Sequence, residues 1–438
     1  MPERNFATPR SRDFALCLHI ADRKREGGQA EMALAISRIV LSQCPEYEHG
    51  WRDIAPAERK PVPNDYSLAV QAADDEQRDG ALENALALYR VVLAQAPRYV
   101  EGQAKLARAL FCLRRWDDAW RAFDIRFKLM ETPPVVTARD REGRPRDLPR
   151  KVEGPLPKKL LVMCEQGMGD TIQFARFLPR LVEAGVNVQA VIPQKLFGLL
   201  RTLDPPPPCL PSEQQSSIVG VESWTMMMDL PLLLGLKEAD YLAREPYLRA
   251  DPVRVARWRD WIAQQQGDRR GPVIAFCWRG NPEHKLDPTR SATLADMAPL
   301  ASIPGATLIC LQRDASDAEI DACGFADRIL RPGPDFDAGI DAFLDSAAIL
   351  TLVDRMVCVD TSLAHVAGAL HGQVDLMLTR DWADWRWIDR DDFNVWYPTL
   401  RIWRRDRDGS YADVVARIAR DVGARAPAPA MDRSKALA

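Results

Sequence analysis

The chain has 438 residues, a length typical of about two to four domains rather than of one small binding module. Its 59 Lys and Arg residues nearly balance 62 Asp and Glu residues, and a formal net charge of −3 argues against a nucleic-acid-binding or polybasic membrane-surface protein. Nine scattered cysteines without Cys-x-x-Cys spacing favour neither a disulfide framework nor a zinc site. No apolar segment approaches the ~18 residues of a membrane span or resembles a signal peptide, so we expect a cytoplasmic protein.

The first third of the chain contains an internal repeat. The segment ALAISRIVLSQCPEY at 33–47 recurs as ALALYRVVLAQAPRY at 85–99, with nine identities in fifteen positions. A further step of 34 residues, the period of tetratricopeptide (TPR) repeats, places Ala85 on Ala119. We therefore predict a TPR-like α-solenoid of about three helical pairs over residues 1–131. It serves either as a helical cover for another domain or as a surface that holds a protein partner.

Residues 132–158 form a segment rich in proline and arginine. Prolines interrupt helices, so this segment is expected to be a linker or an extended crossing. Its basic side chains could contact an anionic ligand, but a solvated connector is the favoured interpretation.

From residue 159 onward, the pattern changes to alternating strands and helices. Strands are expected at 159–163, 186–192, 272–278, 307–311 and 356–359, and helices at 171–184, 193–203, 293–301, 338–353 and 362–370. Such βα series form parallel sheets with helical crossovers, and two successive series predict two doubly wound α/β domains that face each other. We place these domains at 159–258 and 259–425, followed by a disordered tail at 426–438.

Polar clusters follow several of these strands, at the sheet edge where ligands bind in such folds. The clusters consist of Glu165, Gln166, Gly167, Gly169, Asp170 and Thr171; of Trp278, Arg279, Gly280, Asn281, His284 and Arg290; and of Asp360, Thr361, Ser362 and His365, with Gln312 after the strand at 307–311. Glycines allow close backbone approach, helix starts present free N–H groups to anions, and cations suit a diphosphate.

Each cluster also has a purely structural interpretation. Asp170 could cap the helix that it begins, because Asp is a preferred helix N-cap residue. The second cluster could be a polar surface loop, and His365 could be a core histidine. The Asp389-Arg390-Asp391 stretch is similar to the D-x-D metal motif of another transferase fold, but it lies in a charged loop, so we predict no metal site there.

Residues 152–405 resemble the heptosyltransferase-like (family 9-like) glycosyltransferases of the GT-B fold, in particular the bacterial subgroup with N-terminal TPR repeats. The subgroup has EQGxGDTIQFARYLP where this chain has EQGMGDTIQFARFLP at 165–179. It has WxGNPxHxxDxxRS and DTSxAHxAGAL, matched at 278–291 and 360–370, and DWRW…WYP, matched at 384–387 and 396–398. This chain departs from the pattern at Leu286, at 152–154, and at 371–373, where the family has Gly-Lys-Pro.

The resemblance implies a fold class of an N-terminal TPR-like solenoid followed by a GT-B fold. It implies a metal-independent enzyme that transfers a sugar from a nucleotide-sugar to an acceptor, with no further cofactor. Asp170 would be the general base, the rest of the first cluster would face the acceptor, and the other two clusters with Gln312 would bind the nucleotide. The acceptor suggested by the subgroup is flagellin or another surface protein, recruited by the repeats.

One other class of function remains open at the level of sequence. A TPR adaptor could retain a GT-B scaffold without catalysis. A nucleotide-sugar epimerase could use the same fold, but no second acid/base pair supports it. The nucleotide, the sugar and the acceptor are not encoded in any motif that we recognise.

Overall fold

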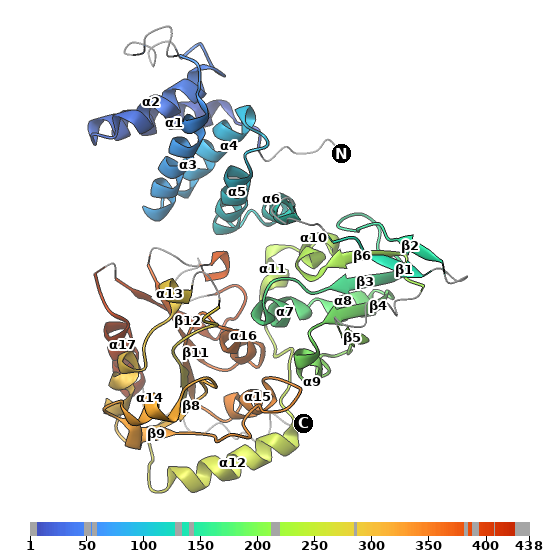
Figure 1. Ribbon diagram of the computed structural model, residues 1–438, viewed down its shortest axis with the longest axis vertical. Helices are drawn as coiled ribbons and strands as arrows, with labels where there is room; N and C mark the ends of the chain where they lie inside the picture. The colour runs from blue at the N-terminus through green and yellow to red at the C-terminus, as the bar shows by residue number, and fades with distance from the viewer. Residues whose placement is uncertain are drawn as a thin grey trace. The chain divides into compact units, whose positions relative to one another are not determined.

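The computed structural model describes residues 7–47, 54, 59–127, 134–139, 144–211, 220–283, 287–380, 384–387, 394–406 and 408–424. Its contacts divide the chain into two compact units, residues 1–134 and 135–438. The first unit is helical and the second contains the parallel sheets (Figure 1). The tail expected at 426–438 and the 389–391 stretch lie outside the described residues.

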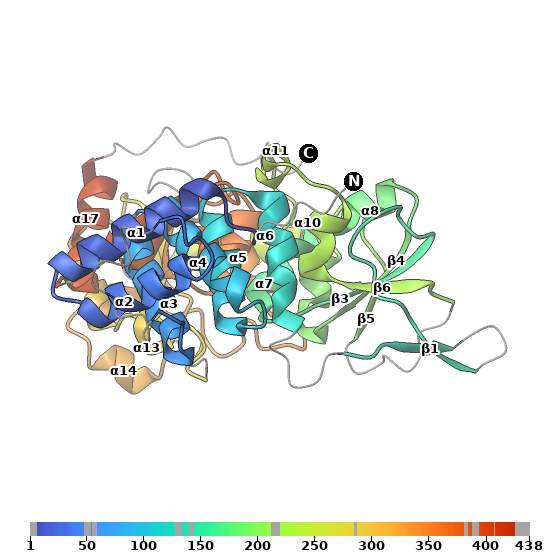
Figure 2. The same cartoon turned by 90° about the horizontal axis from the view of Figure 1, so that it is seen from above.

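The helical unit is built from successive helices that pack on their neighbours in the chain. They are α1 (Ser11–Glu26), α2 (Ala30–Leu41), α3 (Pro63–Arg78), α4 (Leu82–Gln95), α5 (Val100–Cys112), α6 (Trp116–Phe123) and the 3-10 turn η3 (Asp124–Phe127). The two copies of the sequence repeat fall on α2 and α4, whose repeated apolar residues are buried. Figure 2 shows α2 next to α1 and to α3, the two helices that it contacts.

Helices α1 to α4 close on each other as a ring, because α1 contacts both α2 and α4, and α3 contacts the same two helices. The ring has reciprocal ion pairs. Arg38 in α2 lies 3.4 Å from Asp65 in α3, and Arg90 in α4 lies 3.6 Å from Asp13 in α1. Arg90 follows Arg38 by 52 residues, and Asp65 follows Asp13 by the same interval, so the two hairpins are related by an approximate two-fold axis.

This closed arrangement of α1 to α4 differs from a solenoid in which each hairpin stacks on the next, and the α-solenoid expected over residues 1–131 stays a prediction. In an open stack each hairpin contacts the next by the same surfaces, whereas a two-fold pair uses each surface reciprocally. The physical reason is the 52-residue spacing, which gives the second hairpin a longer connection than a 34-residue repeat allows. Whether any of these hairpins is a true TPR stays a prediction.

The sheet unit begins with a part of the predicted linker. Strand β1 (Thr137–Arg139) pairs antiparallel with β2 (Pro145–Asp147). Arg150 then forms an isolated bridge with Trp224, and its guanidinium lies 2.7 Å from the Asp229 carboxylate. The described part of the linker therefore belongs to the sheet unit rather than forming a solvated connector.

The first half of this unit contains a parallel sheet of strand order β5-β4-β3-β6 (Figures 1 and 2). Its elements are β3 (Lys159–Met163), α7 (Met168–Ala175), α8 (Leu178–Glu183), β4 (Asn187–Ile192), η4 (Gln194–Leu196), α9 (Phe197–Leu200), β5 (Cys209–Pro211), β6 (Ser223–Met226), η6 (Met227–Asp229), α10 (Leu230–Leu233) and α11 (Glu238–Tyr241). The helix expected at 171–184 is divided into α7 and α8, because Pro179 at the start of α8 has no N–H to continue α7.

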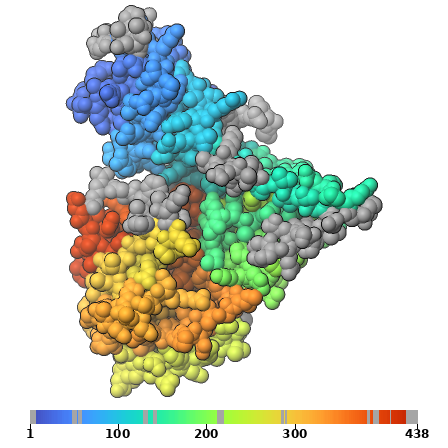
Figure 3. All heavy atoms as spheres, in the orientation of Figure 1, coloured from blue at the N-terminus to red at the C-terminus, as the bar shows by residue number. Residues whose placement is uncertain are grey.

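The second half contains a parallel sheet of order β12-β11-β10-β7-β8-β9. Its elements are α12 (Pro252–Gln266), β7 (Val273–Cys277), α13 (Asp287–Arg290), η7 (Ala295–Ser302), β8 (Thr307–Cys310), α14 (Asp317–Asp321), η8 (Ala326–Arg328), β9 (Ile329–Leu330), α15 (Leu344–Leu350), β10 (Arg355–Val359), α16 (Ser362–Ala369), β11 (Val374–Thr379), η9 (Trp385–Trp387), β12 (Leu400–Arg405) and α17 (Tyr411–Ala424). Figure 3 shows this half, in yellow to red, lying against the green first half.

Two expected boundaries in the second half shift for local reasons. The boundary at 258/259 falls inside α12, and Trp258 of this helix donates its indole N–H to Asp345 in α15 at 2.8 Å. The helix expected at 338–353 is shorter, because the left-handed backbone of Phe343 (φ +65°) prevents its extension toward the N-terminus.

Candidate active site

The first cluster forms the start of α7, directly after β3. Gly167 is the N-cap, and its backbone N–H donates to Asp170 Oδ2 at 2.8 Å. Asp170 is therefore the third residue of the helix and not the N-cap that its structural interpretation expects, and one of its carboxylate oxygens caps the helix by accepting from the N-cap backbone. Its other oxygen is directed to the second half of the unit.

The third cluster forms the start of α16, which packs directly on α7. Thr361 is the N-cap and makes no capping bond with its side chain, so the first N–H groups of α16 are not used by this residue. A Cβ added to Gly169 would lie 2.7 Å from the His365 ring, which means that only glycine permits this approach. The structure thus brings the first and third clusters together.

His365 is buried beside this contact. Its Nδ1 lies 3.0 Å from the hydroxyl of Tyr397, which lies 3.3 Å from the hydroxyl of Tyr247 in the first half. Burial, followed by the positive charge of Arg386, lowers the pKa of His365 to about 3. The ring is consequently neutral at pH 7 and acts by hydrogen bonding and packing.

Arg386 joins the two halves at Asp170. Its Nη2 donates to Asp170 Oδ1 at 2.5 Å, its Nη1 to Asp384 Oδ1 at 2.8 Å, and its Nε to Gln173 Oε1 at 2.5 Å. Burial alone would lower the pKa of Arg386, but the Asp384 and Asp170 carboxylates raise it above its ordinary value. A permanent cation therefore sits beside the candidate base.

Asp360 lies at the end of β10, between cations and Asp384. Loss of water around its carboxylate and the charge of Asp384 raise the pKa of Asp360 to about 6, although Arg290 and Arg386 oppose this shift. Arg290 lies 3.3 Å from Asp287, its neighbour on α13. Arg290 is thus the member of the second cluster whose charge reaches the third.

The side chains of the remaining described residues of the second cluster are used within their own loop and half, and none of their hydrogen bonds or ion pairs is to Asp170, Asp360 or His365. The Trp278 side chain is 1% exposed and belongs to the apolar core, so its ring does not reach a ligand. Arg279 is paired with Asp314 at 3.0 Å and with Glu319 at 2.6 Å. Gln312 Oε1 accepts from the backbone N–H groups of Trp278 and Arg279, both at 3.1 Å, which fixes the loop.

The loop also holds the other predicted residues. The N–H of Gly280 donates to the Ser291 hydroxyl at 3.1 Å, and a Cβ at Gly280 would meet Arg290 at 2.7 Å. Asn281 is exposed and accepts from the Glu283 N–H at 3.1 Å. His284 lies outside the described residues.

The other members of the first cluster support its loop. Glu165 accepts from the Met228 N–H at 3.3 Å, which ties the loop to η6. Gln166 adopts the left-handed conformation (φ +59°), and the hydroxyl of buried Thr171 donates to the Gly167 carbonyl at 3.3 Å.

Sequence reasoning missed Arg386 and Tyr397. Both lie in matched motifs, DWRW at 384–387 and WYP at 396–398, whose tryptophans are typical of aromatic packing. The packing is present, since the Arg386 guanidinium lies 4.2 Å from the Trp385 ring centroid. The signal that could have revealed Arg386 is the single cation within an otherwise apolar and acidic motif.

Within the described ranges, no three His, Cys, Asp or Glu side chains are grouped closely enough to hold a metal ion, and no helix is long and apolar enough to cross a membrane. Metal independence and cytoplasmic location stay predictions.

Comparisons with known proteins give one sequence relative and several similar solved structures. No protein-family model matches the chain. The chain is 27% identical over 342 residues to Protein FlbA of Caulobacter vibrioides. The aligned region covers 72% of this chain and 53% of FlbA. The match thus spans about half the length of that relative.

Similar solved structures include glycosyltransferases. ADP-heptose LPS heptosyltransferase II of E. coli is 15% identical, covers 61% of this chain and 98% of its own, and has a TM-score of 0.40. A family 9 glycosyltransferase of Veillonella parvula is 8% identical, with coverages of 60% and 97% and a TM-score of 0.42. The iron-containing heptosyltransferase TibC is 13% identical, with coverages of 64% and 77% and a TM-score of 0.35.

Proposed function

We propose that the chain is a glycosyltransferase of the GT-B type, which transfers a sugar from a nucleotide-activated donor to an acceptor hydroxyl. The observation that carries this proposal is the meeting of α7 and α16. The start of α7 presents the Asp170 carboxylate, the start of α16 presents backbone N–H groups, and the two helices pack on each other. Transfer of a sugar from a nucleoside diphosphate requires a base on the acceptor side of the sugar and a helix start that binds the diphosphate on its other side.

The reaction divides naturally between these groups. The acceptor oxygen forms a bond to the anomeric carbon of the sugar while the bond from that carbon to the diphosphate breaks. Asp170 takes the proton of the acceptor hydroxyl. The charge that develops on the leaving diphosphate is stabilised by the N–H groups at the start of α16 and by Arg290.

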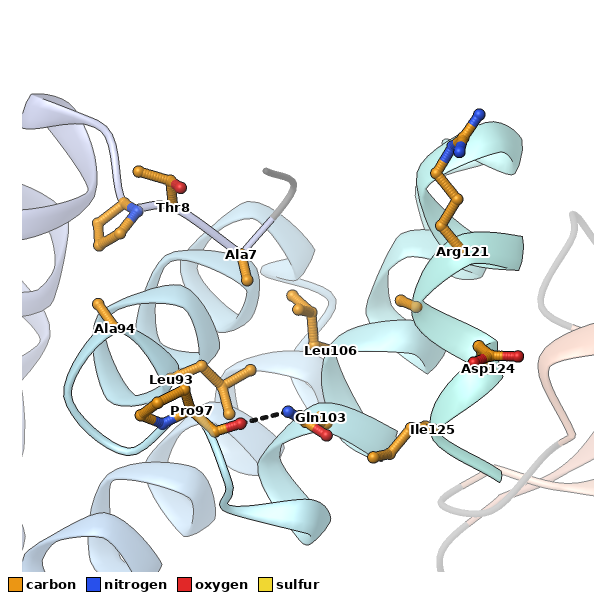
Figure 4. A pocket seen from close by; sticks show the side chains of 12 residues that line it. Ala7, Thr8, Leu93, Ala94, Pro97, Gln103, Leu106, Arg121, Asp124 and Ile125 are labelled. Atoms are coloured by element: carbon orange, nitrogen blue, oxygen red, sulfur yellow. Dashed lines mark hydrogen bonds between the residues drawn. The ribbon is translucent and has the colours of Figure 1, made fainter. Parts of the chain in front are cut away.

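The helical unit is proposed to recruit a protein acceptor. It contains a hollow of about 470 Å³, shown in Figure 4, which is lined by residues from the N-terminal segment, from α4 to α6 and from η3. Leu93, Leu106 and Ile125 make its floor largely apolar, while Arg121 and Asp124 supply charges. Because α1 to α4 close on themselves, this hollow beside α5 and α6 is the surface that we assign to the acceptor.

Nucleotide binding tests the proposal, and the structure offers a matched pair of arginines. We expect Arg290→Ala to weaken binding of a nucleoside diphosphate by about 1.5 to 3 kcal/mol, or roughly 10- to 150-fold, because it removes a charge-assisted bond to phosphate. Arg279→Ala is the control, since Asp314 and Glu319 already hold that guanidinium. Isothermal titration calorimetry with UDP, ADP, GDP and dTDP measures both.

The two variants separate the outcomes. A loss confined to Arg290→Ala supports a nucleotide at the α16 start. Equal affinities of the Arg290→Ala variant and the parent, for every nucleotide that the parent binds, would remove this site from the account. A parent that binds none of the four would favour a non-catalytic scaffold.

A further inference from the structure

Within the described residues, the Arg386 side chain makes two of its three hydrogen bonds across the boundary between the two halves. It comes from η9, after β11 of the second half, yet its Nη2 and Nε bind Asp170 and Gln173, both on α7 of the first half. Its third contact, through Nη1, is to Asp384 in its own segment. Its side chain is 5% exposed, so water cannot replace these partners while the halves are together.

Such a buried guanidinium depends strongly on its acceptors. Removing a charged group from water is costly unless its donors are satisfied and an opposite charge is near. Separation of the halves would leave Arg386 with Asp384 alone among these three side chains. The Asp170 and Gln173 contacts therefore favour the closed arrangement, in which α7 and α16 touch.

The same contact fixes the orientation of the Asp170 carboxylate. Oδ2 accepts from the Gly167 N–H at 2.8 Å and Oδ1 accepts from Arg386 at 2.5 Å, so rotation of the group would break one bond or the other. Each carboxylate oxygen has a further lone pair that can accept from a hydroxyl. The carboxylate is thus oriented without being blocked.

We propose that Arg386 is a positioning residue that aligns Asp170 for proton transfer, and that it does so only when the first and second halves of the sheet unit are together. This inference rests on the proposed function, because it assigns Arg386 a role through the proposed base. It predicts that closure and alignment of the base are one event, since the residue that aligns the base belongs to the opposite half.

The test compares three arginine variants of the full chain by steady-state kinetics of sugar transfer. Misplacement of a reacting group by about 1 Å costs on the order of 10²-fold in rate, so we expect Arg386→Gln to lower kcat by about this factor. The KM for the nucleotide-sugar should change by less than about threefold, because an interaction made only in the transition state affects kcat. Arg386→Lys should recover part of the loss, since it keeps the charge but not the planar fork of donors.

Arg176→Gln is the matched control. Arg176 of the first half also crosses the boundary, where its Nη1 donates to the Trp396 carbonyl at 3.1 Å, but its Nη2 donates to the carbonyls of Asp240 and Tyr241 and not to Asp170. We expect the melting temperature of the Arg176→Gln protein to fall, while its kcat stays within about threefold of the parent value. A merely structural role for Arg386 would make Arg386→Gln and Arg176→Gln alike.

Three results would overturn the inference: parental kcat in folded Arg386→Gln, an equal kcat loss in Arg176→Gln, or a loss confined to KM. If Arg386→Gln does not fold, Arg386→Lys decides, with a kcat loss of about tenfold in support and parental kcat against. Parental kcat in both Arg386 variants, beside an inactive Asp170→Asn protein, would reject the positioning role and keep the function. No transfer by the parent with any donor would reject the function itself.

Discussion

The surroundings of single residues at the boundary between the halves shift their pKa values. Asp360 and His365 lie one helical turn apart around the start of α16, and their pKa values shift in ways that keep both uncharged over part of the acid range. The raised pKa of Asp360 reduces negative charge where the diphosphate is proposed to bind. The lowered pKa of His365 avoids a second cation beside Arg386.

The Asp360 shift predicts a pH dependence of nucleotide binding. Because the pKa of Asp360 is raised to about 6, its carboxylate is ionised at pH 8 and repels a diphosphate, but it is largely protonated at pH 5. We expect Asp360→Asn to bind UDP or ADP several-fold more tightly than the parent at pH 8, with the difference vanishing near pH 5. Calorimetry of both proteins at each pH cancels the titration of the nucleotide.

Stability should follow the same linkage. A folded pKa above the unfolded value contributes stability that is present below the unfolded pKa of about 3.8 and lost as pH rises through about 6. The melting temperature of Asp360→Asn should therefore rise relative to the parent between pH 4 and pH 7. His365 has the opposite sign, because its lowered pKa gives stability that is lost as pH falls from about 6.5 to about 3. A pH-independent difference between Asp360→Asn and the parent would contradict the assignment.

His371 shows why a departure from a family pattern can be tolerated. The family has glycine here, and the residue follows α16 with a left-handed backbone (φ +57°) that glycine adopts without strain. His371 adopts it as well, and its Nε2 lies 2.7 Å from the Ala243 carbonyl of the first half. The departure therefore exchanges backbone freedom for a contact between the halves.

At the scale of elements, the two-fold relation of the first hairpins has a consequence in charge. Lys24 near the end of α1 lies 2.6 Å from Asp75 in α3, and Arg23 lies 2.7 Å from Glu76. Positions 23 and 24 of the first hairpin correspond to positions 75 and 76 of the second, because the repeat interval is 52 residues. Equivalent positions therefore carry opposite charges in the two hairpins. Acidic residues in the last turn of a helix oppose the helix dipole, so Asp75 and Glu76 depend on these partners.

A charge exchange tests this pairing. We expect Lys24→Glu and Asp75→Lys each to lower the unfolding free energy, and the double variant to recover part of the loss, with a coupling of about 0.5 to 3 kcal/mol. Urea unfolding measures the cycle. The same exchange at Asp22 and Arg25, an exposed pair within α1, is the control and should leave α1 to α3 packing unchanged. Zero coupling between positions 24 and 75 would contradict the reciprocal arrangement.

Much of the element order could be predicted from sequence, because it depends on local patterns. The run KLLVM forms β3 within its predicted bounds, and the glycine loop after it begins a helix. The closed ring of α1 to α4 could not be predicted from the repeat alone, since hairpins with the same apolar face can stack openly or face each other. The complementary charges at 23–24 and 75–76 were the available signal.

The site was predicted in part for the same reason. Asp170, Gly169 and His365 lie in motifs at strand ends, and the structure brings them together. The bond from Arg386 to Asp170 spans 216 positions in the chain, and no local pattern encodes such a distance. The loop residues Trp278 and Arg279 show a second limit, because their side chains are used within the loop's own half, Trp278 in the apolar core and Arg279 in ion pairs.

At the scale of the whole molecule, the two units suggest separable tasks. Since β1, β2 and Arg150 belong to the sheet unit, a shortened protein should begin at Val135, not after the proline-rich segment. We expect residues 135–438 to bind nucleoside diphosphate within about twofold of the full chain, because no residue of the proposed nucleotide site precedes Val135. Incorporation of radiolabelled sugar into protein should be lost.

The two readouts distinguish the possible failures of this prediction. Calorimetry reports nucleotide binding, and gel autoradiography of an extract from the expressing cells reports transfer. Full incorporation of label by folded 135–438 would show that the helical unit does not recruit the acceptor, while the proposed chemistry would stand.

The central claim is that Asp170 accepts the proton of the acceptor hydroxyl, and Asp170→Asn measures it most directly. Asn can still accept the Gly167 N–H, but it cannot balance the charge of Arg386, so the melting temperature is expected to fall modestly. Single-turnover transfer by the folded fraction should fall by about 10²–10⁴ while nucleoside diphosphate affinity stays within about twofold. Parental transfer by folded Asp170→Asn would show that Asp170 is a cap and an ion-pair partner, and would contradict its role as the base.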